Sequence, residues 1–511
     1  MDRVGVNFPR AAGILLHPTS LPGRFGMGDM GREAYRFMDL IAETGLGLWQ
    51  LMPLGPTGFG DSPYACFSAF AGNPLLISPE RLREDGLLSE SDLAHSPGFP
   101  EDRVDFGPVI QFRKELLRRA WCNFKSQATA GQRGDFEDFC RACASWLDDF
   151  ALFMALKEVH QTVWNVWEKD LVRRKPAALH RAAKKYSDLV QSQKFAQYLF
   201  FKQWKALKQY ANDLGIRIIG DIPIFVAYDS ADVWAHPEFF QLDDDRAPTV
   251  VAGVPPDYFS KTGQLWGNPL YRWDVMAHEG FQWWVERFRA NLEMLDIIRL
   301  DHFRGFEAYW EVPASEKTAI NGRWVKAPGD AFFRTLCAKI GNVPIIAEDL
   351  GIITPPVEEL RDAFGFPGMK VLQFAFGDDP DNKYLPHNFI PNCAVYTGTH
   401  DNDTTLGWYH HSSAENERDF VRRYLATDGR EIHWDMIRLA FSSVAHTAVV
   451  PLQDVLGLGS EARMNYPGKA SGNWAWRFRE GQLTPDILHR LAELLRLYSR
   501  RKKEKVAGER R

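Results

Sequence analysis

The sequence is short of cysteine, of excess positive charge and of long apolar runs, and each shortage excludes a class of protein. Six cysteines are scattered through 511 residues, which provides no disulfide framework and is typical of a reducing compartment. The net charge of −5 provides no basic surface for nucleic acid. No apolar run approaches the roughly 20 residues of a membrane-spanning helix, and the N-terminus has no signal-peptide character. We therefore predict a cytoplasmic protein with neither nucleic acid nor a membrane as partner.

The usual cofactor and metal motifs are weak or absent. Residues 26–31 match the glycine pattern of a dinucleotide-binding loop, but a proline-containing loop precedes them and no acid ends the second strand. Cys140 and Cys143 form a lone C-x-x-C pair inside an amphipathic helical pattern, which favours buried helix cysteines over a metal site. Neither a P-loop nor a G-x-S-x-G elbow occurs. We expect no cofactor and no bound metal.

Short apolar runs bounded by turn residues alternate with helical patterns along the chain. Several runs are apolar on both faces, as buried parallel strands are. The eight candidate strands lie near residues 13–17, 46–52, 216–222, 297–301, 345–348, 370–375, 394–397 and 447–453. Eight strands that alternate with helices predict an α/β fold of the (β/α)8 TIM barrel type, in which catalytic residues lie at the carboxyl ends of the strands.

The length beyond a minimal barrel is concentrated in two segments. Residues 72–215 have the pattern of a long, mainly helical insertion between the second and third strands. Residues 227–294 are rich in Pro, Gly, Asp and Trp and begin as irregular loop. We predict a single catalytic barrel domain over residues 1–511, with both segments as inserted subdomains that build the walls of a cleft. The basic run at 500–505 is interpreted as a solvated helix end.

Acidic residues follow three of the predicted strands. Arg299 and Asp301 end one apolar run, and because strand side chains alternate, both point to the same face. The arginine favours the ionised form of Asp301, which a nucleophilic aspartate needs. Glu348 ends the next run, and Asp401 follows a third. Two acids that flank one bond are typical of enzymes that cleave glycosides.

Further candidates have both a structural and a functional interpretation. Asp221 lies in an apolar strand end, where it either caps the following loop or orients Arg299 or the substrate. Tyr64 lies in a turn-rich loop after the second strand and is a candidate for stacking on a flat ligand face, such as a sugar ring. Asp257 and Trp266 lie in a stiff, proline-limited loop. Trp266 either stacks on a sugar there or anchors the loop.

Six stretches that occur in order resemble the amylomaltase, or disproportionating-enzyme, family. They are residues 60–64, 220–226, 253–269, 299–305, 347–351 and 398–404. This family comprises the 4-α-glucanotransferases of glycoside hydrolase family 77 in the α-amylase clan. The resemblance implies a calcium-independent (β/α)8 enzyme that transfers α-1,4-glucan segments among maltooligosaccharides and starch or glycogen-derived glucans. It also implies a chain that ends in a helix, without the C-terminal β-sandwich of many α-amylase relatives.

The resemblance also implies residue roles in a retaining double displacement. Asp301 is expected to be the nucleophile, Glu348 the general acid/base and Asp401 the transition-state stabiliser. Arg299 and His400 are expected to flank them and to help bind the substrate. In such enzymes the nucleophile and the acid are only about 5–5.5 Å apart, and a covalent glycosyl-aspartate forms.

Three alternatives accompany this interpretation. The stretch 398–405 contains two aspartates, and the His-Asp pair of the clan pattern selects Asp401 over Asp403. A related α-glucosidase or amylase would use the same acids but accept water, since the difference lies in how well the acceptor site excludes it. A non-catalytic glucan-binding protein would have lost at least one acid, whereas all three are present. We expect a monomer or a weak homo-oligomer.

Overall fold

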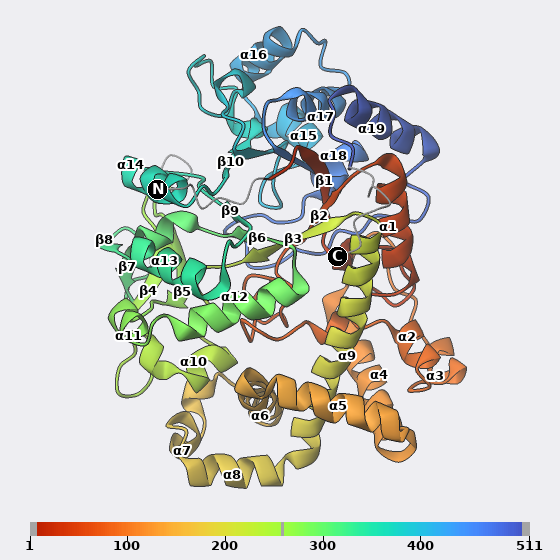
Figure 1. Cartoon of the computed structure of the whole chain (residues 1–511), viewed down its shortest axis with the longest axis vertical. Coiled ribbons are helices and arrows are strands. Elements are labelled where there is room, and N and C mark those ends of the chain that lie inside the picture. The colour runs from red at the N-terminus through yellow and green to blue at the C-terminus, as the bar shows by residue number, and fades with distance from the viewer. Residues whose placement is uncertain (1–7, 257–259, 503–511) are drawn as a thin grey trace.

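Eight parallel strands close into a barrel at the centre of the molecule. The computed structural model describes residues 8–256 and 260–502 (Figure 1). The strands follow one another around the barrel in chain order, and the first pairs with the last. They are β1 (Ala11–Leu15), β2 (Leu48–Gln50), β3 (Arg217–Ile222), β6 (Ile297–Leu300), β9 (Ile345–Ala347), β10 (Gly368–Val371), β11 (Cys393–Tyr396) and β12 (Thr447–Pro451). This arrangement confirms the predicted (β/α)8 fold.

Apolar side chains from all eight strands fill the barrel interior. Parallel strands that are covered on both faces are continuous apolar runs, and β6 and β11 are buried at every position. The inward-facing side chains form one cluster, to which each strand contributes: Leu15, Leu48, Ile219, Ile297, Ile346, Met369, Val371, Ala394, Tyr396 and Val449. Because the interior is a packed core, a reaction site has to be built where the strands end.

Helices cover the outside of the barrel. The longer ones that follow barrel strands are α1 (Arg32–Thr44), α12 (Gln282–Met294), α13 (Gly329–Ile340), α14 (Pro355–Ala363), α16 (Glu415–Leu425), α17 (Ile432–Ser442) and α19 (Pro485–Leu497). Shorter ones are α10 (Ala231–Ala235), α11 (Trp273–His278), α15 (Thr405–Gly407) and α18 (Leu452–Val455). In α1, Phe37, Met38 and Ile41 face the core, and Gly45 ends the helix in the left-handed conformation typical of glycine.

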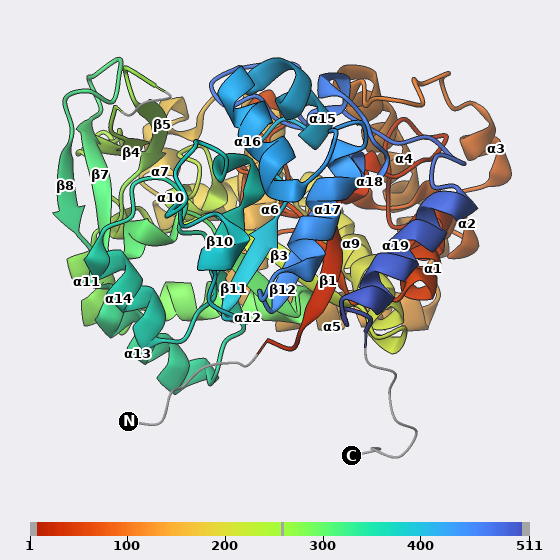
Figure 2. The same cartoon turned by 90° about the horizontal axis from the view of Figure 1, so that it is seen from above.

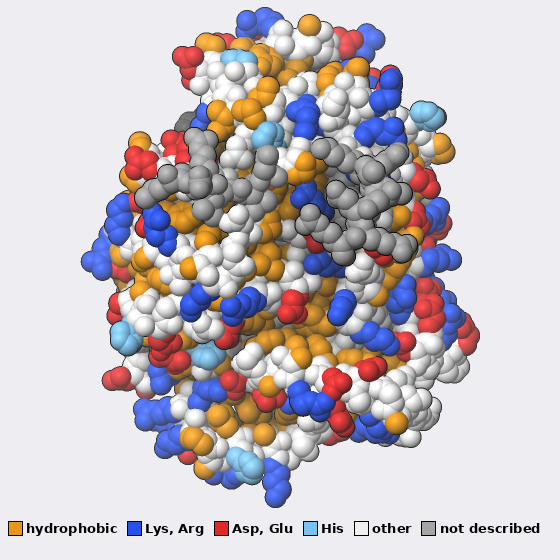
Figure 3. All heavy atoms as spheres, viewed as in Figure 1, with side chains coloured by type: hydrophobic (Ala, Val, Ile, Leu, Met, Phe, Trp, Pro, Cys, Tyr) orange, Lys and Arg blue, Asp and Glu red, His pale blue; other side chains and the backbone are white. Residues whose placement is uncertain are grey.

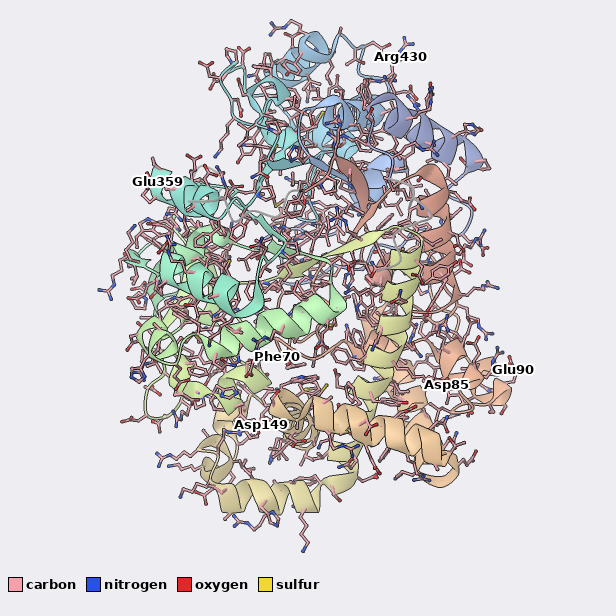
Figure 4. The ribbon with its side chains drawn as sticks, in the orientation of Figure 1. Phe70, Asp85, Glu90, Asp149, Glu359 and Arg430 are labelled. Atoms are coloured by element: carbon pink, nitrogen blue, oxygen red, sulfur yellow. The ribbon has the colours of Figure 1, made fainter. Side chains whose placement is uncertain are left out.

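The segment between β2 and β3 is mainly helical. It contains α2 (Pro79–Glu84), α3 (Glu90–Ala94), α4 (Phe106–Gln127), α5 (Ala130–Ala142), α6 (Ala144–His160), α7 (Lys169–Val172), α8 (Pro176–Lys185) and α9 (Ser187–Asp213). Ion pairs connect these helices, and Figure 4 labels two of the acids, Asp85 and Asp149. Lys202 Nζ of α9 donates to Asp85 Oδ2 at the end of α2 (2.8 Å), and Arg174 Nη2, before α8, donates to Asp149 Oδ1 of α6 (2.7 Å).

A second, antiparallel sheet lies to one side of the barrel, opposite the flank that α1 and α19 cover (Figure 2). Its four strands, in spatial order, are β5 (Gln264–Pro269), β4 (Val250–Val254), β7 (Ala308–Pro313) and β8 (Arg323–Lys326). The prediction that Trp266 lies in a loop is therefore wrong, because it lies on β5, which pairs with β4. Most of β5 is exposed, so it has no apolar alternation from which to predict a strand. The division of the chain into a barrel with two inserted subdomains stays a prediction.

The C-terminal basic run begins inside the protein. Arg500 is fully buried, and its guanidinium donates to backbone carbonyls, from Nε to Phe441 (2.7 Å) and from Nη1 to Ala11 (3.1 Å). The interpretation of this run as a solvated helix end is thus wrong at Arg500. Backbone oxygens satisfy the buried guanidinium, which ties the end of the chain to α17 and β1.

The surface carries both signs of charge. On the face shown in Figure 3, Lys and Arg side chains are interspersed with Asp and Glu side chains. Among residues 8–256 and 260–502, no helix is both long enough and apolar enough to cross a membrane. That nucleic acid and membranes are not partners stays a prediction.

Candidate active site

The carboxyl ends of three neighbouring strands bring Asp221, Asp301 and Glu348 to one place. Asp221 of β3 pairs in register with Arg299 of β6. The last residues of β6 and β9 are also Cα partners, and Asp301 and Glu348 directly follow them. Neighbouring strands lie about 4.8 Å apart. The two acidic residues therefore leave the barrel side by side.

Arg299 holds two carboxylates at once. Its Nη1 donates to Asp221 Oδ2 (2.5 Å) and to Asp301 Oδ1 (2.8 Å). The side chains of Arg299 and Asp221 are 4% and 1% exposed, whereas that of Asp301 is 26% exposed. Burial acts to lower the pKa of Arg299, but the two carboxylates raise it well above its ordinary value. Of these three side chains, Asp301 is the one that can meet a substrate.

Asp221 lies beneath the site and holds its neighbours in place. Burial raises the pKa of Asp221 to about 7, against the opposing charge of Arg299. Because Arg299 remains a cation, their short contact is a charge-assisted hydrogen bond. The hydroxyl of Tyr64 also donates to Asp221 Oδ2 (2.7 Å). Asp221 thus orients Arg299 and Tyr64, one of the two interpretations that its sequence position allows, while its own side chain is almost fully buried.

Glu348 is held by backbone N–H groups at both of its oxygens. His302 N donates to Oε2 (2.7 Å) and Leu350 N to Oε1 (3.0 Å). Burial, followed by the negative charge of Asp301, raises the pKa of Glu348 to about 8, although Arg299 and both N–H groups oppose the rise. A carboxyl group with this pKa is protonated at neutral pH and can act as a general acid.

Asp401 is the most exposed of the predicted catalytic acids, with 49% of its side chain accessible. Asn465 Nδ2 donates to its Oδ1 (2.6 Å), and His400 Nε2 lies 3.5 Å from the same oxygen. Arg463 Nη2 donates to the backbone oxygen of Asp401 (2.7 Å). Asp403, by contrast, accepts a hydrogen bond from Ser460 Oγ (2.7 Å) and one from a backbone N–H. The carboxylate of Asp403 is thus engaged by its neighbours, and the choice of Asp401 over Asp403 stays a prediction.

Three aromatic rings form one side of the site. Tyr64 stacks on His400 with 5.1 Å between ring centroids and 21° between planes, and Trp474 contacts both rings at 5.8 and 5.9 Å. Burial lowers the pKa of His400, although Asp401 opposes this. His400 is therefore a neutral ring next to Asp401 and can exchange hydrogen bonds with sugar hydroxyls.

Trp266 approaches the same strand ends from the small sheet. Its ring is 38% exposed and meets the ring of His302 edge to face, with 4.7 Å between centroids. An exposed indole that packs on His302, the residue after Asp301, can stack on a sugar. Asp257, which the sequence also proposes for substrate binding, lies outside the described residues.

The segment after β12 contributes site residues that the sequence did not predict: Arg463, Asn465 and Trp474. None of them follows a strand directly, so the strand-end rule does not find them. The one usable signal is Trp474, a large aromatic residue that directly follows a polar stretch with two glycines at 467–473. In the part of the chain that the structure describes, no cluster of three or more His, Cys, Asp or Glu side chains could hold a metal ion.

Comparison with known proteins decides the family. The model of the glycoside hydrolase family 77, described as 4-alpha-glucanotransferase, matches residues 16–484. The chain belongs to this family.

Individual members of the glycoside hydrolase family 77 agree with that assignment. A 4-alpha-glucanotransferase of Thermus thermophilus is 55% identical over 94% of this chain and 97% of its own length. One from Synechocystis sp. is 52% identical over 96% of this chain and 98% of its own length. Among solved structures, an amylomaltase from Streptococcus agalactiae in complex with acarbose has a TM-score of 0.93 and 41% identity, over 96% of this chain and 99% of that chain.

Proposed function

We propose that the protein is a 4-α-glucanotransferase that moves α-1,4-glucan segments to the 4-hydroxyl of an acceptor glucan or glucose by a retaining double displacement. The observation that carries this proposal is the register of β6 and β9, which sets Asp301 beside Glu348 at neighbouring strand ends. Backbones of neighbouring strands lie about 4.8 Å apart, which is compatible with the about 5–5.5 Å between the carboxyl groups that a retaining mechanism requires. A carboxyl separation of that size leaves no room for the water that an inverting enzyme places between its acids.

In the first step Asp301 is the nucleophile and Glu348 the acid. The carboxylate of Asp301, held by Arg299 at 2.8 Å, attacks the anomeric carbon of the donor sugar. The bond from that carbon to the leaving oxygen breaks, and the proton of Glu348 moves to this oxygen. The products are a glycosyl ester on Asp301 and a shortened glucan with a free 4-hydroxyl. Asp401 and His400 bind ring hydroxyls of the distorted sugar, most strongly in the transition state.

In the second step Glu348 acts as a base instead of an acid. As a carboxylate it removes the proton from the 4-hydroxyl of the acceptor, whose oxygen attacks the anomeric carbon and displaces Asp301. The new glycosidic bond has the configuration of the old one, because each step inverts the carbon once. Trp266, exposed beside His302, supports the acceptor sugar by stacking and excludes water from the ester.

The proposal also covers the substrates of the protein, its cellular compartment and its oligomeric state. The relatives named 4-alpha-glucanotransferase support maltooligosaccharides and starch or glycogen-derived glucans as substrates. The six cysteines are all free thiols, in agreement with a cytoplasmic protein. The monomeric or weakly associated state stays a prediction.

Incubation with maltotriose alone, without added metal, tests the proposal. We expect glucose together with a ladder of chains longer than maltotriose, resolved by chain length. Only glucose and maltose, with no longer chains, would instead identify a hydrolase that uses the same acids. No turnover at all, with maltotriose or with longer maltooligosaccharides, would contradict both enzymatic functions and favour a binding protein.

The pH dependence of kcat/KM is expected to have a basic limb near pH 8. Glu348 has to be protonated to donate, and its raised pKa of about 8 means that the acid form prevails at neutral pH and is lost above it. The rate should then fall about tenfold per pH unit. Initial rates between pH 6 and 10 measure it, and a flat profile through pH 9.5 would contradict the role of Glu348.

A further inference from the structure

His302 has a backbone conformation that residues with a side chain rarely adopt. Its φ of 49° and ψ of 51° lie in the left-handed region, where non-glycine residues are uncommon. His302 directly follows Asp301, at the end of β6. Such conformations persist only where the surrounding structure maintains them, and they cluster at active sites.

This conformation directs three successive N–H groups to neighbouring strands. Asp301 N donates to the oxygen of Ile222 in β3 (3.0 Å), His302 N to Glu348 Oε2 (2.7 Å) and Phe303 N to the backbone oxygen of Glu348 (3.0 Å). These three hydrogen bonds therefore depend together on the backbone conformation at residue 302. A change of φ and ψ at His302 would break at least one of the two bonds to Glu348.

The bond from His302 differs from the other bond to the carboxyl group. Leu350 N, which donates to Oε1 (3.0 Å), belongs to the same loop as Glu348 and moves with it. His302 N comes from the end of another strand, next to Asp301. It is therefore the donor that fixes the plane of the Glu348 carboxyl group relative to Asp301, and this plane decides where the acid proton points.

The imidazole ring of His302 is held by its surroundings. Trp266 of β5 packs on it edge to face, at 4.7 Å and 80°. Gly305 leaves the space that the ring needs, because a Cβ there would come within 3.1 Å of His302 Cδ2 and within 2.7 Å of the side chain of Ile224. Burial lowers the pKa of His302 to about 4, so the ring is neutral and adds no charge beside Asp301.

We propose that His302 is a positioning residue for Glu348: its left-handed backbone conformation directs its N–H to Glu348 Oε2. The inference rests on the proposed role of Glu348 as acid and base.

Three substitutions separate the backbone conformation from the imidazole. His302→Val disfavours the left-handed region, whereas His302→Asn and His302→Gly adopt it readily, and all three remove the ring. We expect kcat for transfer from maltotriose to fall about 100-fold in His302→Val, as when one fixed donor to a reacting group is lost. In the Asn and Gly variants it should fall no more than about tenfold. In His302→Val, KM should change less than kcat, because the proposed mechanism gives His302 itself no sugar contact.

The pH profile distinguishes positioning from a general loss of structure. Burial and the charge of Asp301 raise the pKa of Glu348, while Arg299 and the N–H groups of His302 and Leu350 lower it. Loss of the His302 donor therefore moves the basic limb of His302→Val to higher pH even as kcat falls. The pH profile of His302→Asn should have its basic limb at the same pH as that of the unchanged protein. A merely destabilised enzyme would lose kcat without a shift of the limb.

Two results would overturn the inference. One is an equal loss of kcat in all three variants, and the other is His302→Val with unchanged kcat and an unchanged basic limb. If His302→Val does not fold, the Asn and Gly variants decide, since each has to retain at least a tenth of the original kcat. Glu348→Gln tests the proposed function separately. If Glu348→Gln is active, the role of Glu348 fails, whereas inactive Glu348→Gln with unaffected His302→Val refutes only the inference.

Discussion

Asp301→Asn is expected to abolish transfer, with kcat reduced on the order of 10⁴- to 10⁶-fold, as in other enzymes that lose their nucleophile. The amide is isosteric and can still accept the hydrogen bond that Arg299 donates to Asp301 Oδ1, but it cannot form the glycosyl ester. Because Arg299 keeps its partner Asp221 and residue 301 is partly exposed, the free energy of unfolding should change by less than about 1 kcal/mol. Glucose release from maltotriose and urea unfolding measure the two effects.

Asp403→Asn is the matched control for this loss. Asp403 is also an aspartate in the loop that follows the barrel strand β11, but its carboxylate accepts hydrogen bonds from Ser460 and from a backbone N–H. Its replacement should leave kcat within about tenfold.

A donor whose glycosyl ester forms faster than it is transferred should label the unchanged protein. The label should add the mass of one glycosyl unit to the peptide that contains Asp301. Label on another peptide, or more than a hundredth of the original activity in Asp301→Asn, would refute the role of Asp301.

The barrel could be predicted from the sequence because its strands are buried on both faces. A run such as Ile297–Leu300, buried throughout, differs from its flanking helices in length and in periodicity. The small sheet could not be predicted in the same way. Its edge strands, β5 and β8, are short and largely exposed, and the pairing at its centre joins residues 250–253 of β4 to residues 310–313 of β7, which are far apart in the chain. Trp266 was consequently expected in a loop.

The candidate site likewise has residues that could be predicted from the sequence and residues that could not. Asp301 and Glu348 directly follow apolar strands, so the topology of a parallel barrel is enough to bring them together. The hydrogen bond from Asn465 to Asp401 crosses 64 residues, and Trp474 reaches Tyr64 from still further along the chain. No local pattern indicates such contacts. The hydrogen bond between Asp221 and Arg299 likewise depends on the register of β3 with β6.

Arg299→Met is expected to lower the free energy of unfolding by about 3–5 kcal/mol, the usual cost of removing one partner from a buried ion pair. The methionine fills a similar volume but leaves the buried carboxylate of Asp221 without its cation, at 1% exposure. Asp301 loses its hydrogen-bond donor at the same time. Stability and transfer should therefore both fall, and urea unfolding together with the maltotriose assay will show both losses.

A second substitution separates the two effects of Arg299. In Arg299→Met/Asp221→Asn the buried carboxylate is gone, so part of the lost stability should return, while transfer stays low because Asp301 still lacks Arg299. Arg36→Met is the matched control, because Arg36 and Glu480 form an ion pair of the same 2.5 Å length on the surface, and its loss should cost less than about 1 kcal/mol. If the double variant is no more stable than Arg299→Met, the uncompensated charge of Asp221 is not what Arg299 offsets. If it recovers transfer as well, Arg299 serves the fold alone, and Asp301 needs no cation to react.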